Sequence, residues 1–352
     1  MLRWPGMPAL VGMSLLGFTS FFLTLSSLPV YAVELGVPEA LAGLVTTVML
    51  TATVASQLVV PAAVRWIGQR ATLTIGLLAL GAPTPLLLLN DQLWWLLAVS
   101  AVRGIGFAIL TVLTPLIATQ IAPPGSYGRA IGLYGLAVAV PNVAAVPTAV
   151  ALTGAGHFPV VAVLAAVPVL AIPLAWKFPE PPEQSGRRSA RSTLPIRRLS
   201  GILALLLALT LSGGGIFAIL PVQLPDPAVV TWALLLLGVT SALARWRAGA
   251  LADRAGPARL LPVCAAIGVV GLAILALGVS GTGSGVLVVL GTAVFGIAYG
   301  GAQNLTLLLS FDLAGADRRT GASAAWNATY DAGTAIGALL IGAIAAGSSL
   351  SV

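Results

Sequence analysis

The chain is dominated by eleven apolar runs, each long enough to cross a bilayer and each separated from the next by a short polar turn. About 20 apolar residues in helical conformation span the hydrocarbon core, where backbone polar groups must be bonded within the segment. The runs occupy residues 8–31, 39–63, 71–89, 93–120, 128–152, 157–177, 199–223, 228–246, 260–280, 284–311 and 320–346. The sequence therefore predicts an all-α integral membrane protein.

Composition favours the same fold class. Hydrophobic residues make up 58% of the chain and charged residues 8%, whereas a soluble domain carries about 25% charged residues. The first run follows Arg3 and exceeds the apolar core of a signal peptide, about 7–15 residues, so we expect a retained membrane helix. The single cysteine, Cys264, excludes an internal disulfide and lies in an apolar run, where packing is its expected role.

The net charge of +7 could indicate a nucleic-acid partner, but the positions of the basic residues are explained by membrane topology. Counted from a cytoplasmic N-terminus, the even loops hold Arg65 and Arg70, then Arg129, then 177–198, 245–259, and Arg318 with Arg319. The odd loops carry acids and neither Lys nor Arg. This is the positive-inside distribution. We expect a plasma (inner) membrane protein with a cytoplasmic N-terminus and no nucleic-acid partner.

The sequence contains an internal repeat. A tight polar turn at 249–256, GALADRAG, has an eroded copy that starts at residue 61, PAAVRWIGQR, an offset of 188 residues. AVRGIGF from residue 101 corresponds to AVFGIAY from residue 293, and Arg129 corresponds to Arg319. Such offsets indicate two six-helix-type bundles with pseudo-two-fold symmetry.

The repeat also predicts the domain organisation. We expect an N-terminal bundle in 1–177, a cytoplasmic linker in 178–198, rich in Pro, Ser and Arg, and a C-terminal bundle in 199–352. The offset would place a twelfth helix at 347–367, beyond the last residue. We therefore expect 6 + 5 membrane helices, either because the protein is short or because its C-terminal end is missing.

The motifs resemble those of the major facilitator superfamily of transporters. The family's loop motif is matched by Gly249, Leu251, Ala252, Asp253, Arg254 and Gly256, followed by Arg259. Arg103, Gly104 and Gly106 resemble a fourth-helix motif of proton-coupled members, and Gly132, Gly135 and Pro141 resemble a degraded fifth-helix antiporter motif. The resemblance implies two bundles rocking about a central substrate cavity, alternating access and no cofactor.

The loop motif predicts a cytoplasmic gate. Asp253 directly precedes the ninth helix, whose unpaired N–H groups would stabilise the carboxylate by about 0.3–1 kcal/mol. Gly249 and Gly256 permit a tight turn and a close approach to a neighbouring helix. A tight turn with topology-setting charges is the alternative.

The first copy of the motif lacks this acid. It keeps Gly68 and Arg70 but has Arg65 in place of the aspartate. We expect the gate chemistry to be lost or inverted there.

Two ionisable residues, Arg103 and Asp331, lie deepest in the predicted helices, about 10 to 11 residues or roughly 15 Å from a helix end. A charge at that depth is costly unless it faces a polar cavity or a partner. Asp331 shares a helix face with Ser323, Asn327 and Thr334. It is expected either to bind substrate or carry the coupling proton, or to act as a hydrogen-bonded anchor between bundles. Arg103 is expected to stabilise a proton-linked conformation or an anionic substrate group, with pairing to backbone carbonyls as the alternative.

Further polar residues of the tenth helix, Tyr299, Gln303 and Asn304, are expected to line the substrate cavity. The sequence has no zinc-ligand cluster, nucleotide-binding Gly-Lys loop or nucleophile elbow, so we expect neither an enzyme nor a metal site. The preferred interpretation is a monomeric secondary transporter that exports a small organic molecule in exchange for protons. A proton symporter or uniporter for a sugar or amino acid, and a non-transporting membrane scaffold or sensor, are the alternatives.

Overall fold

The structure, a computed structural model, describes residues 3–25, 27–178, 194–224, 226–280 and 284–348. These residues form α-helices, short 3-10 helices and turns, so the predicted all-α fold is confirmed. Most of the predicted linker, residues 179–193, lies outside the described ranges.

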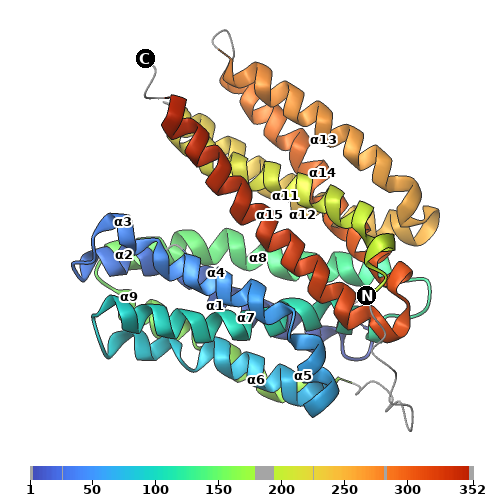
Figure 1. Cartoon of the computed structure of the whole chain (residues 1–352), viewed down its shortest axis with the longest axis horizontal. Coiled ribbons are helices and arrows are strands. Elements are labelled where there is room, and N and C mark those ends of the chain that lie inside the picture. Colours follow the sequence, from blue (N-terminus) through green and yellow to red (C-terminus); the bar gives the residue numbers. More distant parts are fainter. Residues whose placement is uncertain (1–2, 26, 179–193, 225, 281–283, 349–352) are drawn as a thin grey trace. The chain divides into compact units, whose positions relative to one another are not determined.

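The helices follow the predicted runs in order (Figure 1). The first half of the chain contains α1 (Met7–Leu25), α2 (Ser27–Glu34), α3 (Glu39–Ala42), α4 (Leu44–Gln57), α5 (Val60–Ile67), α6 (Gln69–Gly81), η1 (Thr84–Leu88), α7 (Leu93–Ile121), α8 (Tyr127–Gly154), α9 (Phe158–Leu164), η2 (Val167–Ala171) and α10 (Ile172–Ala175). The second half contains α11 (Ile196–Gln223), α12 (Pro227–Ala255), α13 (Pro257–Val279), α14 (Gly285–Ala314), η3 (Ala316–Arg318) and α15 (Arg319–Ser348).

Several predicted runs are broken helices. The run at 39–63 bends by 56° between α4 and α5. The run at 157–177 contains Pro168 and Pro173, and 3-10 geometry separates α9 from α10, because proline removes a backbone donor and clashes with the preceding turn. Within the described ranges, nine helices have the length and hydropathy to cross a membrane, or ten if α4 and α5 form one bent span. The polar α15, which covers the eleventh run, is not among them.

The chain divides into two compact units. The first comprises Met1–Ala122, Ala137–Thr193 and Ser323–Ala328, and the second comprises Pro123–Leu136, Leu194–Ala322 and Thr329–Val352. The domain boundaries predicted from the sequence, at 177 and 199, stay a prediction.

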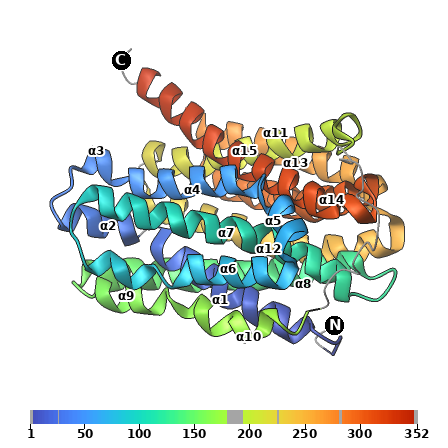
Figure 2. The same cartoon turned by 60° about the horizontal axis from the view of Figure 1, so that its bottom comes forward.

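In the first unit, α7 is the central helix. It packs along α4 and α6, and α4 runs beside it in Figure 2. Gly104 faces the backbone of α4 at Met49, and Gly106 faces the backbone of α6 at Gly76. Small residues allow such close backbone contact, which is the main source of helix association in a membrane. The phenyl rings of Phe21 and Phe107 stack with centroids 3.9 Å apart.

In the second unit, α14 is central and is flanked by α12 and α13 (Figure 1). The helices α11 and α15 also meet closely. Gly333 packs against Thr210, and Gly337 packs against the backbone of Leu211. The tenth predicted helix therefore lies at the centre of the second unit, and the eleventh is held by contacts at its glycines.

Candidate functional site

The loop motif folds into the end of α12 and a one-residue turn. Gly256 adopts φ 82°, a left-handed conformation that favours glycine, and it is the N-cap of α13. No side chain caps α13. Asp253 lies in the last turn of α12. The prediction that Asp253 stabilises the N-terminus of the following helix is therefore wrong.

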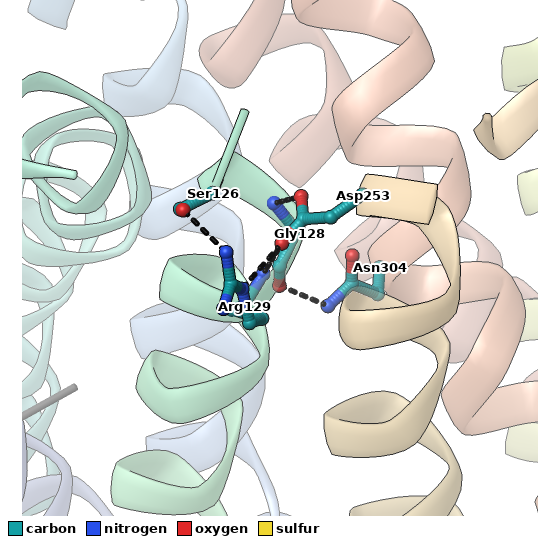
Figure 3. Close-up of polar contacts among 5 residues, drawn as sticks. All are labelled: Ser126, Gly128, Arg129, Asp253 and Asn304. Atoms are coloured by element: carbon teal, nitrogen blue, oxygen red, sulfur yellow. Dashed lines mark hydrogen bonds and ion pairs between the residues drawn. The ribbon is translucent and has the colours of Figure 1, made fainter. Parts of the chain in front are cut away.

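The carboxylate of Asp253 caps a different helix, α8, and Figure 3 shows the arrangement. One carboxylate oxygen accepts a hydrogen bond from Gly128 N at 2.7 Å. The other accepts hydrogen bonds from Arg129 N at 3.1 Å and Arg129 Nε at 3.0 Å. The first N–H groups of a helix have no partner within it and carry the positive end of its dipole, so an acid is favoured there. We call this set of contacts the Asp253 clamp.

The shielded part of the clamp is the carboxylate. The side chain of Asp253 is 9% exposed and that of Arg129 is 43% exposed. An exposed ion pair contributes little, because water and salt screen it. The two backbone donors, which are part of the buried helix start, therefore contribute most of the clamp's stability.

Backbone contact brings α8 and α12 close enough for this clamp. Gly128 and Gly249 face each other so closely that a Cβ atom on either would overlap the carbonyl oxygen of the other. Asn304 of α14 reinforces the contact: its Nδ2 donates to Gly128 O at 3.3 Å and to Arg245 O at 3.0 Å (Figure 3). Three helices of the second unit thus meet at one point.

The same face of α8 continues along α12. A Cβ on Gly132 would lie 3.0 Å from Trp246 O, and a Cβ on Gly135 would lie 2.6 Å from the side chain of Arg245. The glycines that resemble an antiporter motif are therefore the residues at which α8 packs on α12. Pro141 is buried further along α8.

The other residues of the loop motif lie at the surface. Leu251, Arg254 and Arg259 are exposed. In the first copy, Gly68 adopts the same φ of 82° as Gly256. Arg65 is exposed, and Arg70 Nε donates to Phe178 O at 2.9 Å. The two copies of the motif have the same backbone conformation at the turn glycine, but only the second copy has the acid, Asp253.

Arg103 lies in α7 and is completely buried. Its Nε donates to Leu80 O at 3.2 Å, and its Nη2 donates to Ser20 O at 3.1 Å and to Ser20 Oγ at 3.3 Å. Its Nη1 is buried without a hydrogen-bond partner. Arg103 therefore pairs with backbone carbonyl groups, which was the alternative role expected for it.

The polar face of α15 divides between the two units. Ser323 Oγ donates to Val112 O at 2.7 Å, and Asn327 Nδ2 donates to Thr111 O at 3.2 Å, both within the first unit. Asp331 belongs to the second unit and is half-buried. Asn327 and Asp331, predicted to act together, thus have different surroundings.

Asp331 lies within electrostatic reach of a tyrosine pair. Tyr299 of α14 and Tyr330 of α15 are joined by a 2.8 Å hydrogen bond between their hydroxyl groups, and the charge of Asp331 acts on both. The sequence indicated Tyr299 but not Tyr330. A helical pattern through Asp331 would not have found Tyr330, because it precedes Asp331 directly and lies on another side of the helix.

Arg245 is a second candidate residue that the sequence pattern does not indicate. The charge pattern placed 245–259 in a cytoplasmic loop, but Arg245 lies inside α12, which continues to Ala255. Its Nη1 donates to Gln303 Oε1 at 3.0 Å. The apolar run at 228–246, which includes Arg245, was the signal that could have placed it in the helix.

Metal binding has no support in the described ranges, where no group of three His, Cys, Asp or Glu side chains is arranged to hold an ion.

Comparisons with known proteins identify the family. The family profile of the Major Facilitator Superfamily matches residues 10–347. The fold is similar to that of the transporter FucP in the outward conformation, with 15% identity, 96% of this chain and 90% of that chain covered, and a TM-score of 0.69. A variant of the E. coli fucose:proton symporter FucP gives 15% identity, coverage of 97% and 92%, and a TM-score of 0.73. The human organic anion transporter MFSD10 (TETRAN) gives 16% identity, coverage of 95% and 92%, and a TM-score of 0.69.

The structural matches, at such low identity, show the fold alone. No curated protein matches the sequence. The family profile covers nearly the whole chain, and the helices and turn motif described above agree with it. The chain therefore belongs to the Major Facilitator Superfamily: it is a multi-pass integral membrane protein and a secondary transporter, not an enzyme.

Proposed function

We propose that this transporter exports a small organic molecule in exchange for protons, by alternating access across the plasma (inner) membrane. The observation that carries the proposal is the position of Asp331. It is the twelfth residue after the start of α15, about 18 Å along the helix axis at 1.5 Å per residue. A carboxylate this far from a helix end is characteristic of proton and substrate pathways, because it can take up and release a proton inside the protein.

The tyrosine pair supports a proton-carrying role for Asp331. The two hydroxyl groups of Tyr299 and Tyr330 are hydrogen-bonded to each other and lie in the electrostatic field of the carboxylate. A hydroxyl group can both donate and accept a hydrogen bond, so the tyrosines can accommodate both the charged and the neutral form of a neighbouring acid. Substrate binding by the same carboxylate is the second role consistent with this position.

The Asp253 clamp supports a gated cycle. Its hydrogen bonds join the end of α12 to the start of α8, and both ends belong to loops that the charge pattern assigns to the cytoplasm. We propose that the clamp forms when the cytoplasmic side closes and breaks when it opens. Gly132 and Gly135 pack on α12 beside the clamp, and their resemblance to an antiporter motif supports exchange rather than symport.

Transport by purified protein in liposomes tests the proposal. With acid inside, an antiporter accumulates substrate as protons leave, whereas a symporter accumulates substrate with acid outside. A uniporter equilibrates substrate in both conditions, and a scaffold or sensor gives no flux. We expect accumulation with acid inside for at least one compound in a panel of small organic molecules. Accumulation with acid outside, gradient-independent flux or no flux would each contradict proton-coupled export.

The role of Asp331 has its own test. Asp331→Asn removes the proton-carrying group but keeps its size, so we expect loss of gradient-driven accumulation and retention of substrate exchange between equal concentrations. Asp226→Asn is the matched control, because Asp226 caps α12 through a bond to Ala228 N at 2.9 Å, and asparagine caps helices equally well. Full gradient-driven accumulation by Asp331→Asn would exclude Asp331 as the carrier.

A further inference from the structure

Arg245 places an unpaired positive charge inside α12. It lies ten residues before the end of the helix at Ala255, which is about 15 Å along the axis. Arginine keeps its charge in proteins, and a charge at this depth is costly without a partner. Yet no carboxylate in the described part of the chain forms an ion pair with Arg245. Among the described residues, its guanidinium therefore has no salt-bridge partner, although the carboxylate of Asp331 acts on the same tyrosine, Tyr330.

The contacts that Arg245 does make are neutral. One donor, Nη1, bonds to Gln303 Oε1 at 3.0 Å. The guanidinium carbon lies 5.5 Å from the ring centroid of Tyr134. Its Nε is buried and has no hydrogen-bond partner. A guanidinium has five N–H donors in a planar fork, so most of the donors of Arg245 have no partner among the described protein residues.

The surroundings of Arg245 combine this charge with aromatic rings. Tyr299 precedes Gln303 by one helical turn of α14, and its hydroxyl is bonded to that of Tyr330. Tyr330 lies within electrostatic reach of Arg245. Tyrosine rings offer flat apolar faces with polar ends. This cluster of Arg245, Gln303, Tyr134, Tyr299 and Tyr330 matches a ligand with an anionic head and an aromatic body.

We propose that Arg245 is the anion-recognition residue of the substrate site and that the transported molecule is an aromatic carboxylate. This inference rests on the proposed transport function. A guanidinium binds a carboxylate through two parallel charge-assisted hydrogen bonds, which supply both the missing countercharge and acceptors for the unused donors. The tyrosine rings of the cluster provide contacts for the aromatic body of the substrate.

Arg245 also connects this site to the Asp253 clamp. Gly135 of α8 covers the Arg245 side chain so closely that a Cβ there would lie 2.6 Å from Nε. Arg245 and Asp253 lie eight residues apart on α12, a little more than two turns. When the start of α8 is released from Asp253, the covered donor becomes available to a ligand. Binding of the carboxylate and opening of the clamp therefore favour each other.

Ligand-induced thermal stabilisation of the full-length protein in detergent tests the proposal. Benzoate and phenylacetate are the probes, and benzamide and phenylacetamide are their uncharged controls. We expect each carboxylate to raise the Tm of the wild type and each amide to leave it unchanged, since ligands that bind the folded state stabilise it. Equal effects of the acids and the amides, or no effect of either, would overturn the proposal.

Variants of α12 assign the effect to one residue. Arg245→Gln should weaken carboxylate binding by at least about tenfold, the usual effect of losing a charged hydrogen-bond partner. Arg247→Gln is the matched control, because Arg247 is exposed and lies over Trp246 with 5.0 Å between guanidinium carbon and ring centroid. If Arg245→Gln does not fold, Arg245→Lys replaces it, and we expect weakened binding because lysine lacks the planar fork. Carboxylate binding of wild-type strength in a folded Arg245 variant would refute the assignment.

The two proposals fail separately. Accumulation of an uncharged compound in acid-loaded liposomes, together with no carboxylate-specific stabilisation, would leave proton-coupled export in place and remove the role of Arg245. Carboxylate binding at Arg245 without any gradient-driven flux would support the role of Arg245 and contradict proton-coupled export.

Discussion

Replacing Asp253 with asparagine should open the contact between α8 and α12. Asparagine keeps the shape of the side chain but loses its charge, and it places an NH2 group where one oxygen accepted hydrogen bonds. The hydrogen bond from Gly128 N to the remaining side-chain oxygen can persist. The hydrogen bonds from Arg129 N and Arg129 Nε, at 3.1 and 3.0 Å, are lost. The mutation therefore acts on the start of α8 and leaves the core of the second unit unchanged.

The size of the effect follows from these contacts. A hydrogen bond to a charged group contributes about 1.5–3 kcal/mol, and the helix dipole adds about 0.3–1 kcal/mol. The ion pair with the half-exposed Arg129 adds about 0–1 kcal/mol. We expect Asp253→Asn to destabilise the clamped state by about 2–4 kcal/mol, which changes the ratio of open to clamped protein by about 30-fold or more.

Thiol labelling measures this ratio. Ser126 lies beside the clamp, is 5% exposed and accepts a 2.6 Å hydrogen bond from Arg129 Nη2. Cys264 is the single native cysteine, so a Cys264→Ala background leaves a Ser126→Cys reporter as the one thiol. Because position 126 is buried beside the clamp, this thiol should react with a maleimide only when the clamp opens. We expect Asp253→Asn to raise the labelling rate by about 30-fold or more, in proportion to the open fraction.

Two comparisons make the result decisive. Arg129→Gln removes the exposed ion pair and keeps both backbone donors, so its labelling rate should rise by less than about fivefold. Asp226→Asn should leave the rate unchanged. An unchanged rate in Asp253→Asn, or an equal rise in Arg129→Gln, would refute the conclusion that the backbone of α8 is the principal partner of the carboxylate.

Three further predictions concern single positions. Asn304→Ala removes the bonds to Gly128 O and Arg245 O, and it should raise labelling of the Ser126→Cys reporter by less than Asp253→Asn does, because both lost bonds are neutral. Gly256→Ala should lower the Tm, since a φ of 82° costs a residue with a Cβ about 1–2 kcal/mol, whereas the exposed Arg254→Ala should leave the Tm unchanged. Arg103→Met should not lower the Tm, because it removes a buried charge that has no acid partner among the described residues, and a fall in the Tm would show that its three hydrogen bonds outweigh its desolvation.

The helices and the turn could be predicted because their signals are local. Membrane-length apolar runs and the glycine at the end of each motif copy depend on neighbouring residues, and Gly68 and Gly256 indeed adopt the same conformation. The prolines at 168 and 173 could also have predicted the break between α9 and α10, but the prediction of spans used only the length of each apolar run.

The partners of the polar residues could not be predicted, because they are distant in sequence. Asp253 and Gly128 are 125 positions apart, and no local pattern relates them. A helix dipole does stabilise the Asp253 carboxylate, but the helix is α8 and not the adjacent α13. Arg245 was misplaced for a different reason: its neighbours Arg247 and Arg254 suggested a loop, although the helical pattern continues to Ala255.

The contact between Gly128 and Gly249 has a consequence for energy conservation. Protons move rapidly along chains of water molecules, and such a chain needs a continuous space at least one molecule wide. Two backbones that touch without intervening side chains leave no such space at this point. In a transporter driven by a proton gradient, this contact of bare backbone would close one point of the path by which protons could leak back without substrate, and a single methyl group at either glycine would force the two helices apart there.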